Sequence, residues 1–132
     1  MKHSKEDLIK YRIQRAYESL NEAKLLAENH FWNTVANRLY YSCFYIVSAL
    51  FSKFDILSKS HSGTKNEFHR SFIKSGIFEK EMGRTYSDLF DKRQEGDYQD
   101  FYSFEKEDVE PLIEQTEEFV DKLKDYIIKA EK

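Results

Sequence analysis

Apolar residues recur at alternating intervals of three and four along most of this chain, the period of helices that bury one face. The first run predicts an amphipathic helix from about Ser4 to His30, with Ser4 as its N-cap and Asp7 in its first turn. Its inward positions are Ile9, Ile13, Ala16, Leu20, Ala23 and Ala27. A very short turn follows, so we expect this helix to pair antiparallel with the next one as a hairpin.

The segment Asn33–Phe54 predicts the central helix of the fold, because two apolar stripes run side by side along it. One stripe contains Trp32, Val35 or Ala36, Leu39, Cys43, Ile46 and Leu50. The other contains Tyr40, Phe44, Val47, Phe51 and Phe54. A helix with two adjoining apolar stripes has neighbours on more than one side, as in the middle of a bundle.

A third stripe on the same segment is rich in hydroxyl groups, and we call it the hydroxylated stripe. It contains Thr34, Arg38, Tyr41, Tyr45, Ser48 and Ser52, at spacings of 4, 3, 4, 3 and 4. Arg38 is the one charged residue between Asn33 and Ser52. A charge on a mostly buried helix must be paired, hydrated or functional, since an unpaired buried charge costs several kcal/mol. The stripe is therefore either a candidate site or the location of a structural salt bridge.

The rest of the chain predicts further helices. Asp55–Gly63 is polar and serine-rich and is expected to be a loop, followed by a short helix from Thr64 to Lys74. Another helix should cover Glu79–Asp97 and be closed by Gly96, before an aromatic connector at 99–104. A last amphipathic helix follows, and Pro111 leaves its start open: either Asp108 caps it, or a turn begun at Ser103 bends at Pro111. We therefore predict an all-α fold for residues 1–132 as one domain: a four-helix up-and-down bundle with an additional short helix.

Charge is unevenly distributed along the 132 residues, whose formal net charge is −3. Residues 53–84 contain seven Lys or Arg against four acids, whereas residues 105–132 contain ten acids against five lysines. The overall balance argues against a general polyanion binder, but the middle segment is basic enough to meet phosphates, with tyrosines and phenylalanines that could stack on bases. The alternative is that these charges are only the solvated faces of helices.

Other kinds of chemistry have little support in the sequence. No His-x-x-x-His pair and no glycine-rich phosphate loop is present, so we expect no metal and no cofactor. The single cysteine, Cys43, lies on an apolar stripe and is expected to be a core residue in a reducing compartment. The N-terminus has no hydrophobic signal region, and no segment reaches transmembrane length without charge, so we expect a cytoplasmic protein without membrane association.

Four short motifs in order along the chain resemble the HEPN family, the nucleotide-binding domains of higher eukaryotes and prokaryotes. They are Ala23-Lys24-Leu25-Leu26, Asn37-Arg38-Leu39-Tyr40-Tyr41, Ser60-His61-Ser62-Gly63 and Arg93-x-x-Gly96-Asp97-Tyr98. The resemblance covers nearly the whole chain and implies a helical bundle that forms a homodimer. Many such domains are ribonucleases of toxin–antitoxin and defence systems with a small nucleotidyltransferase as antitoxin, and others only bind RNA or a partner protein.

The nuclease members carry an Arg followed, after four to six residues, by a His. The resemblance implies that Arg38 matches this Arg and that Asn37 matches a polar neighbour, while Tyr45 occupies the position of the His. A tyrosine hydroxyl keeps its proton until about pH 10 and is a poor general base at neutral pH. His61, which also matches a family position, could supply the imidazole or could only hold its loop. Arg93 and Asp97 could form a helix-end pair, or Asp97 could neutralise Arg38 across the bundle.

Two hypotheses follow from these residues. In the first, the protein is a homodimeric binding module for RNA or a nucleotidyltransferase-type partner, with Asn37, Arg38, Tyr41, Tyr45 and Ser48 at the contact, and this is favoured because Tyr45 replaces the His. In the second, it is a metal-independent endoribonuclease in which Arg38 acts with Tyr45 or His61 as catalytic residues. Arg93 and Asp97 are supporting residues in both. The sequence leaves open whether the hydroxylated stripe is a dimer contact or an open groove.

Overall fold

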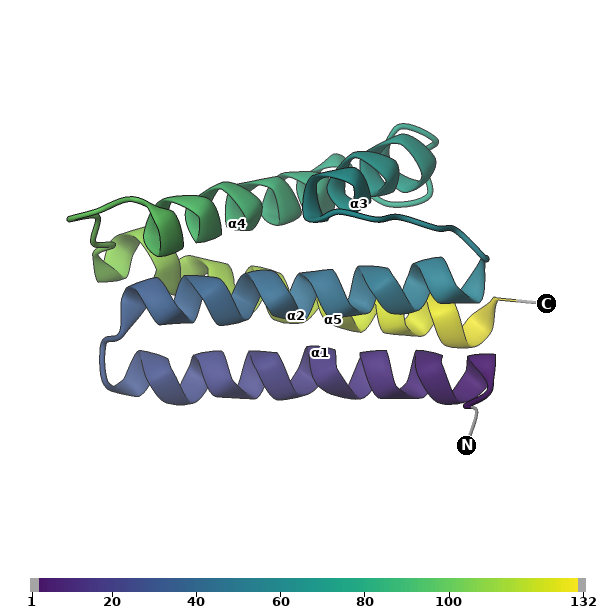
Figure 1. Ribbon diagram of the computed structural model, residues 1–132, viewed down its shortest axis with the longest axis horizontal. Helices are drawn as coiled ribbons and strands as arrows, with labels where there is room; N and C mark the ends of the chain where they lie inside the picture. The colour runs from purple at the N-terminus through teal and green to yellow at the C-terminus, as the bar shows by residue number, and fades with distance from the viewer. Residues whose placement is uncertain (1–2, 131–132) are drawn as a thin grey trace.

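The computed structural model describes residues 3–130 and is helical almost throughout. Its elements are α1 (Lys5–Glu28), α2 (Trp32–Lys53), α3 (His61–Phe68), a π-helical turn at His69–Ile73, α4 (Lys80–Tyr98) and α5 (Lys106–Lys129). The four long helices run alternately up and down, with α2 lying between α1 and α4 and α5 behind it (Figure 1). Helix α3 and the π-helical turn fill one end of the bundle beside α4. The predicted all-α bundle with one short extra helix is confirmed.

Helix α1 begins where the sequence predicts. The Ser4 hydroxyl accepts a hydrogen bond from the Asp7 amide at 3.1 Å, and the Asp7 carboxylate accepts one from the Ser4 amide at 3.2 Å. This reciprocal pair satisfies two amides that have no partner within the helix. At the other end, His30 adopts a positive φ of 62° and turns the chain directly into α2. The predicted antiparallel hairpin of α1 and α2 is confirmed.

Helix α2 is the core of the bundle, as its two apolar stripes indicate. The first stripe is entirely buried, from Trp32 to Leu50. In the second stripe Tyr40, Val47 and Phe51 are buried, but Phe54 is exposed because it lies just past the helix end. None of the six members of the hydroxylated stripe is fully buried: Thr34 is exposed and the other five are half-buried. The core therefore leaves this stripe as the accessible face of α2.

The predicted start of the third helix is wrong by three residues. Ser60 caps α3, and its hydroxyl accepts from the Gly63 amide at 2.9 Å, so Gly63 lies in the first turn and does not close a loop. A glycine is found at this position because a Cβ there would lie 2.8 Å from the Ser60 hydroxyl, so the glycine leaves room for the cap. This earlier start places His61 at the first position of the helix.

Gly96 does not end α4, which continues to Tyr98. A Cβ at this position would lie 3.1 Å from the ring of Phe104, so the glycine allows the connector after α4 to pack closely. The connector is held at two points by the Asn33 side chain, which donates to the Tyr102 carbonyl at 2.9 Å and accepts from the Phe104 amide at 2.8 Å. This attachment fixes the end of α4 against the start of α2.

Neither predicted start of the last helix is correct. Glu105 is the N-cap of α5, and Asp108 completes a capping box by accepting from the Glu105 amide at 2.9 Å. Pro111 lies inside the helix as its sixth residue, past the first turn. The proline gives up one helical hydrogen bond there, and the capping box at the preceding residues stabilises the start of the helix.

Candidate functional site

Three of the motifs that are distant in sequence meet on one side of α2. The cluster contains three residues of α2, the first residue of α3 and two residues from the last two turns of α4. We call it the Arg93 cluster, and its members are Tyr40, Tyr41, Phe44, His61, Arg93 and Tyr98. The fold thus combines one guanidinium, one imidazole and four aromatic rings in one place.

Arg93 is at the centre of this cluster and is only 6% exposed. Its guanidinium carbon lies 4.7 Å from the ring centre of Tyr40, 5.7 Å from that of Tyr41 and 5.6 Å from that of Tyr98. Its Nη1 donates long hydrogen bonds to the Tyr41 hydroxyl at 3.3 Å and the Tyr98 hydroxyl at 3.5 Å, and its buried Nε has no partner. Among residues 3–130, no carboxylate lies within ion-pair distance of it. A guanidinium stays charged at physiological pH, so this is a buried positive charge held only by aromatic faces and phenols.

The two pairings considered for Asp97 are both absent from the structure. Asp97 accepts a hydrogen bond from the Asn37 side chain at 2.7 Å and pairs neither with Arg93 nor with Arg38. Arg38 turns towards α1, where its Nε lies 3.5 Å from the Glu22 carboxylate. The charge of Arg38 is therefore matched within the fold, whereas the charge of Arg93 is not.

His61 is fixed in the cluster by contacts on several sides. Its Nδ1 shares a hydrogen bond of 2.6 Å with the Tyr40 hydroxyl, and its ring centre lies 4.5 Å from that of Phe44 and 5.8 Å from that of Tyr41. Burial, and after it the positive charge of Arg93, lowers the pKa of His61 below the ordinary value for histidine. The imidazole is therefore neutral at pH 7, with one nitrogen anchored by Tyr40, and can give or take a proton through the other.

The remaining predicted residues lie further along the same face of α2. Arg38 stacks over Tyr41, with 5.2 Å between the guanidinium carbon and the ring centre, and Arg15 of α1 stacks over Tyr45 at 5.1 Å. Arg12 of α1 donates to the Ser48 carbonyl at 3.3 Å. The predicted residues thus form two groups. Tyr41, His61 and Arg93 belong to the Arg93 cluster, and Asn37 and Asp97 bond each other next to Tyr98 in the sequence of α4. Arg38, Tyr45 and Ser48 instead contact residues of α1.

The sequence interpretation missed the central role of Arg93, although the spacing could have shown it. Met82, Tyr86 and Leu89 form the apolar face of α4, and position 93 continues their 4, 3, 4 spacing, so an inward arginine follows from the helical period. Tyr40 and Phe44 were assigned to the core, and both also contact His61. Arg12 and Arg15 of α1 were not among the residues predicted for the site.

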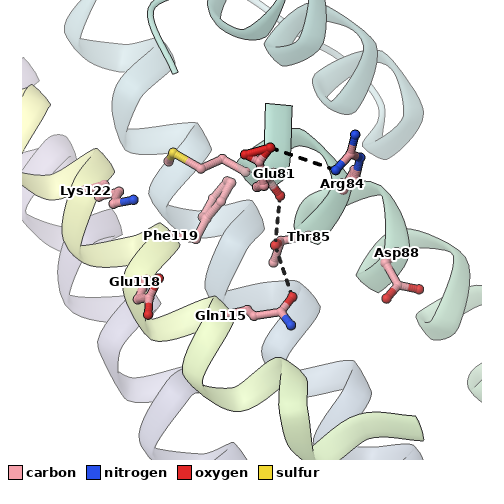
Figure 2. A pocket seen from close by; sticks show the side chains of 9 residues that line it. Glu81, Arg84, Thr85, Asp88, Gln115, Glu118, Phe119 and Lys122 are labelled. Atoms are coloured by element: carbon pink, nitrogen blue, oxygen red, sulfur yellow. Dashed lines mark hydrogen bonds and ion pairs between the residues drawn. The ribbon is translucent and has the colours of Figure 1, made fainter. Parts of the chain in front are cut away.

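A separate cleft of about 490 Å³ lies between α4 and α5. Figure 2 shows that its polar side chains come from both helices, with Glu81, Arg84 and Thr85 on one wall and Gln115 and Lys122 on the other. Arg84 pairs with Glu81 at 3.9 Å, and Thr85 donates to the Gln115 side chain at 3.4 Å. Asp88 and Lys122 pair with Lys92 and Glu79, which do not line the cleft, so among the described residues no arginine without a carboxylate partner lies in it.

In the described part of the chain, no three side chains of the metal-binding types come together. No helix within residues 3–130 combines the length and the apolar character needed to cross a bilayer.

The fold and the site define a small helical-bundle domain with a basic, aromatic-lined site on one face of its central helix. The chain belongs to the HEPN family: the family model described as "HEPN domain" matches residues 9–126. A "UPF0332 protein" from Thermotoga maritima is 39% identical over 125 residues, which cover 95% of each chain. Two proteins from Methanocaldococcus jannaschii, named "Putative toxin MJ0142" and "Putative toxin MJ0605", are 33% and 32% identical over 88% and 85% of this chain, and over 79% and 83% of their own lengths.

Proposed function

We infer that this protein is a toxin-type HEPN domain that binds single-stranded RNA at the Arg93 cluster. The observation that carries this inference is the buried guanidinium of Arg93, which lacks a carboxylate partner in the described part of the chain and is surrounded by aromatic rings. A phosphodiester supplies the missing negative charge, and the rings of Tyr41 and Tyr98 provide faces on which bases stack. The names of the Methanocaldococcus relatives support the toxin setting.

Two partners belong to this proposal. The protein forms a homodimer, and its antitoxin is a small nucleotidyltransferase-type protein that contacts the same face of α2. The half-buried hydroxylated stripe supports both, since it is the accessible surface of the central helix beside the Arg93 cluster. Light scattering tests the dimer, and competition between purified antitoxin and labelled RNA tests whether the two share a surface.

The test of RNA binding is fluorescence anisotropy with a short labelled single-stranded RNA. Replacing Arg93 by Met should weaken binding at least tenfold and reduce the salt dependence by about one phosphate contact. Replacing Arg84 by Met is the matched control, because Arg84 is a 75% exposed arginine on the same helix but lies in the α4–α5 cleft. Equal affinities for all three proteins would contradict the proposal.

A second candidate function is metal-independent cleavage of RNA, and one observation favours it. The neutral His61 lies beside Arg93, whose charge contributes to lowering the pKa of the imidazole. His61 would move a proton between the 2′-hydroxyl and the leaving oxygen, while Arg93 stabilises the negative charge of the phosphorane. Arg38, with its charge matched by Glu22, and Tyr45 would then act in binding and not in proton transfer.

A cleavage assay in the presence of a chelator separates the two candidates. If the protein is a nuclease, His61→Ala and Arg93→Met should abolish cleavage, while Tyr45→Phe should retain it. Loss of cleavage in Arg38→Ala but not in Arg93→Met would instead favour the site predicted from the sequence. RNA that is bound but left intact by the wild-type protein would support the binding module alone.

A further inference from the structure

A second pocket lies next to the Arg93 cluster on the same face of α2. It has a volume of about 500 Å³ and lies between the start of α1, the second half of α2 and the segment leading into α3. We call it the Tyr45 pocket, and the lining residues that matter here are Arg12, Phe44, Tyr45, Ser48, Ser52 and Thr64. An ion pair of 3.2 Å between Lys5 and Asp55 lies at its edge.

The Tyr45 pocket is continuous with the Arg93 cluster through one side chain. Phe44 lines the pocket and also packs its ring against His61, with 4.5 Å between the ring centres. The ring of Tyr45 is 6.3 Å from that of Tyr41, which in turn hydrogen-bonds Arg93. A chain of aromatic rings therefore leads from the proposed phosphate site into the pocket.

The lining has the chemistry of a site for a flat, polar ring. Phe44 and Tyr45 offer aromatic faces, while Ser48, Ser52, Ser58 and Thr64 contribute hydroxyl groups. The Ser52 hydroxyl accepts from Arg12 and can still donate, and the Ser58 and Thr64 hydroxyls bond each other at 2.7 Å, so this wall of the pocket is polar and suits a ligand with a polar edge. A nucleobase stacks on the rings and exchanges hydrogen bonds with hydroxyl groups, so it matches both features.

Arg12, which also lines the pocket, supplies a second positive charge. It is half-buried, and its Nη1 donates to the Ser52 hydroxyl at 2.6 Å and the Ser48 carbonyl at 3.3 Å. In the described part of the chain it forms no ion pair with a carboxylate. Along the face of α2 the order is thus an arginine without a carboxylate, a group of aromatic rings, and a second such arginine. That order fits a nucleic-acid strand whose phosphates flank a stacked base.

We propose that the Tyr45 pocket is a nucleobase subsite: it receives the base next to the phosphate held at the Arg93 cluster and gives the protein its base preference. This proposal rests on the proposed RNA binding and adds to it the location of specificity. The pocket, and not the Arg93 cluster, would then determine which RNA sequences are recognised.

The test combines pocket variants with an RNA that lacks a single base. Tyr45→Ser removes an aromatic face, and Ser48→Trp fills the pocket. Each should weaken binding of a short single-stranded RNA about tenfold, which is the effect of losing one stacked base. An otherwise identical RNA with an abasic ribose at the bound position should bind the wild-type protein about tenfold more weakly. The two pocket variants should show no further loss with that RNA, because the same interaction is already missing.

Two controls make the outcome decisive. Gln115→Trp places the same bulky side chain in the α4–α5 cleft and should leave RNA affinity unchanged, and thermal unfolding of each variant shows that it is folded. Normal RNA affinity in folded Tyr45→Ser and Ser48→Trp, with binding lost in Arg93→Met, would overturn the base subsite and leave the proposed function intact. No binding by the wild-type protein, or normal binding by Arg93→Met, would refute the proposed function and the subsite with it. A changed oligomeric state in the pocket variants with unaltered RNA affinity would also overturn the subsite.

Discussion

Replacing Arg93 by methionine should stabilise the fold while it removes the proposed affinity for RNA. An unpaired buried charge costs several kcal/mol, and in this protein three aromatic contacts of roughly 0.5–1 kcal/mol each and two long hydrogen bonds offset only part of that cost. Methionine has a similar length, and its sulfur makes favourable contacts with aromatic rings such as Tyr40. We therefore expect the free energy of unfolding to rise by about 1–2 kcal/mol, in the range found when buried charges are replaced by apolar residues.

The matched variant is Arg38→Met, for which the opposite sign is expected. Removing Arg38 leaves a buried oxygen of the Glu22 carboxylate without its counter-charge. Because both side chains are partly exposed, the loss should be small, about 0.5–1 kcal/mol. Replacing these two arginines by methionine is thus expected to change the free energy of unfolding in opposite directions.

Urea unfolding of the wild-type protein and both variants, followed by far-UV circular dichroism and fitted with a common m-value, measures the difference. The wild-type protein with both arginines intact is the reference, and coincident curves from tyrosine and tryptophan fluorescence check that unfolding is two-state. A decrease of about 1 kcal/mol in the free energy of unfolding of Arg93→Met would refute the reasoning. It would mean that the fold itself compensates the charge, so that no external anion is needed.

Three further predictions concern the elements that hold the site. Ser60→Ala removes the cap of α3 and should lower the free energy of unfolding by about 1 kcal/mol, measured by urea titration, while Ser60→Asp should retain most of it. Gly83→Ala should lower the Tm although alanine favours helix, because its Cβ would lie 2.8 Å from the ring of His69, which is held by a hydrogen bond to Ser87. An unchanged or higher Tm would show that the ring moves aside freely. Burial lowers the pKa of both His61 and His69, so the unfolded chain binds protons more tightly, and the free energy of unfolding should fall as the pH drops below about 6.5. His61→Asn should make this dependence on pH less steep. A free energy of unfolding that rises on acidification would contradict the lowered pKa of the two histidines.

Helix positions and the core could be predicted from the sequence because they depend on a local period. The alternation of three and four in α1 and α2 identifies the buried positions from Ala16 to Leu50 without any knowledge of the neighbours. Helix ends were less predictable, since they depend on single side chains. Gly63 and Gly96 resemble terminators in the sequence, but each makes room for one other group, the Ser60 hydroxyl and the Phe104 ring.

The candidate site was predicted in its components and not in its arrangement. The sequence indicates that Arg38, His61, Arg93 and Asp97 belong to shared motifs, but not which charge is matched. Whether the charge of Arg38 is matched depends on Glu22 of α1, which belongs to none of these motifs. The helical period does not show that its carboxylate faces Arg38. Pairing across helices is a tertiary property, so the distinction between a neutralised Arg38 and an unmatched Arg93 required the structure.

The attachment of the connector by Asn33 bears on when the site comes into being during synthesis. The first sixty residues contain the α1–α2 hairpin, which can form as a local unit as soon as it leaves the ribosome. This unit already includes Arg12, Tyr45 and the Arg38–Glu22 pair, but it lacks Arg93 and Tyr98. These two residues reach their places only when the end of α4 docks on α2, and the Asn33 bonds to Tyr102 and Phe104 complete that docking. The Arg93 cluster therefore cannot be complete until the residues up to Phe104 have been made, so a chain still under synthesis lacks the proposed RNA site until that point.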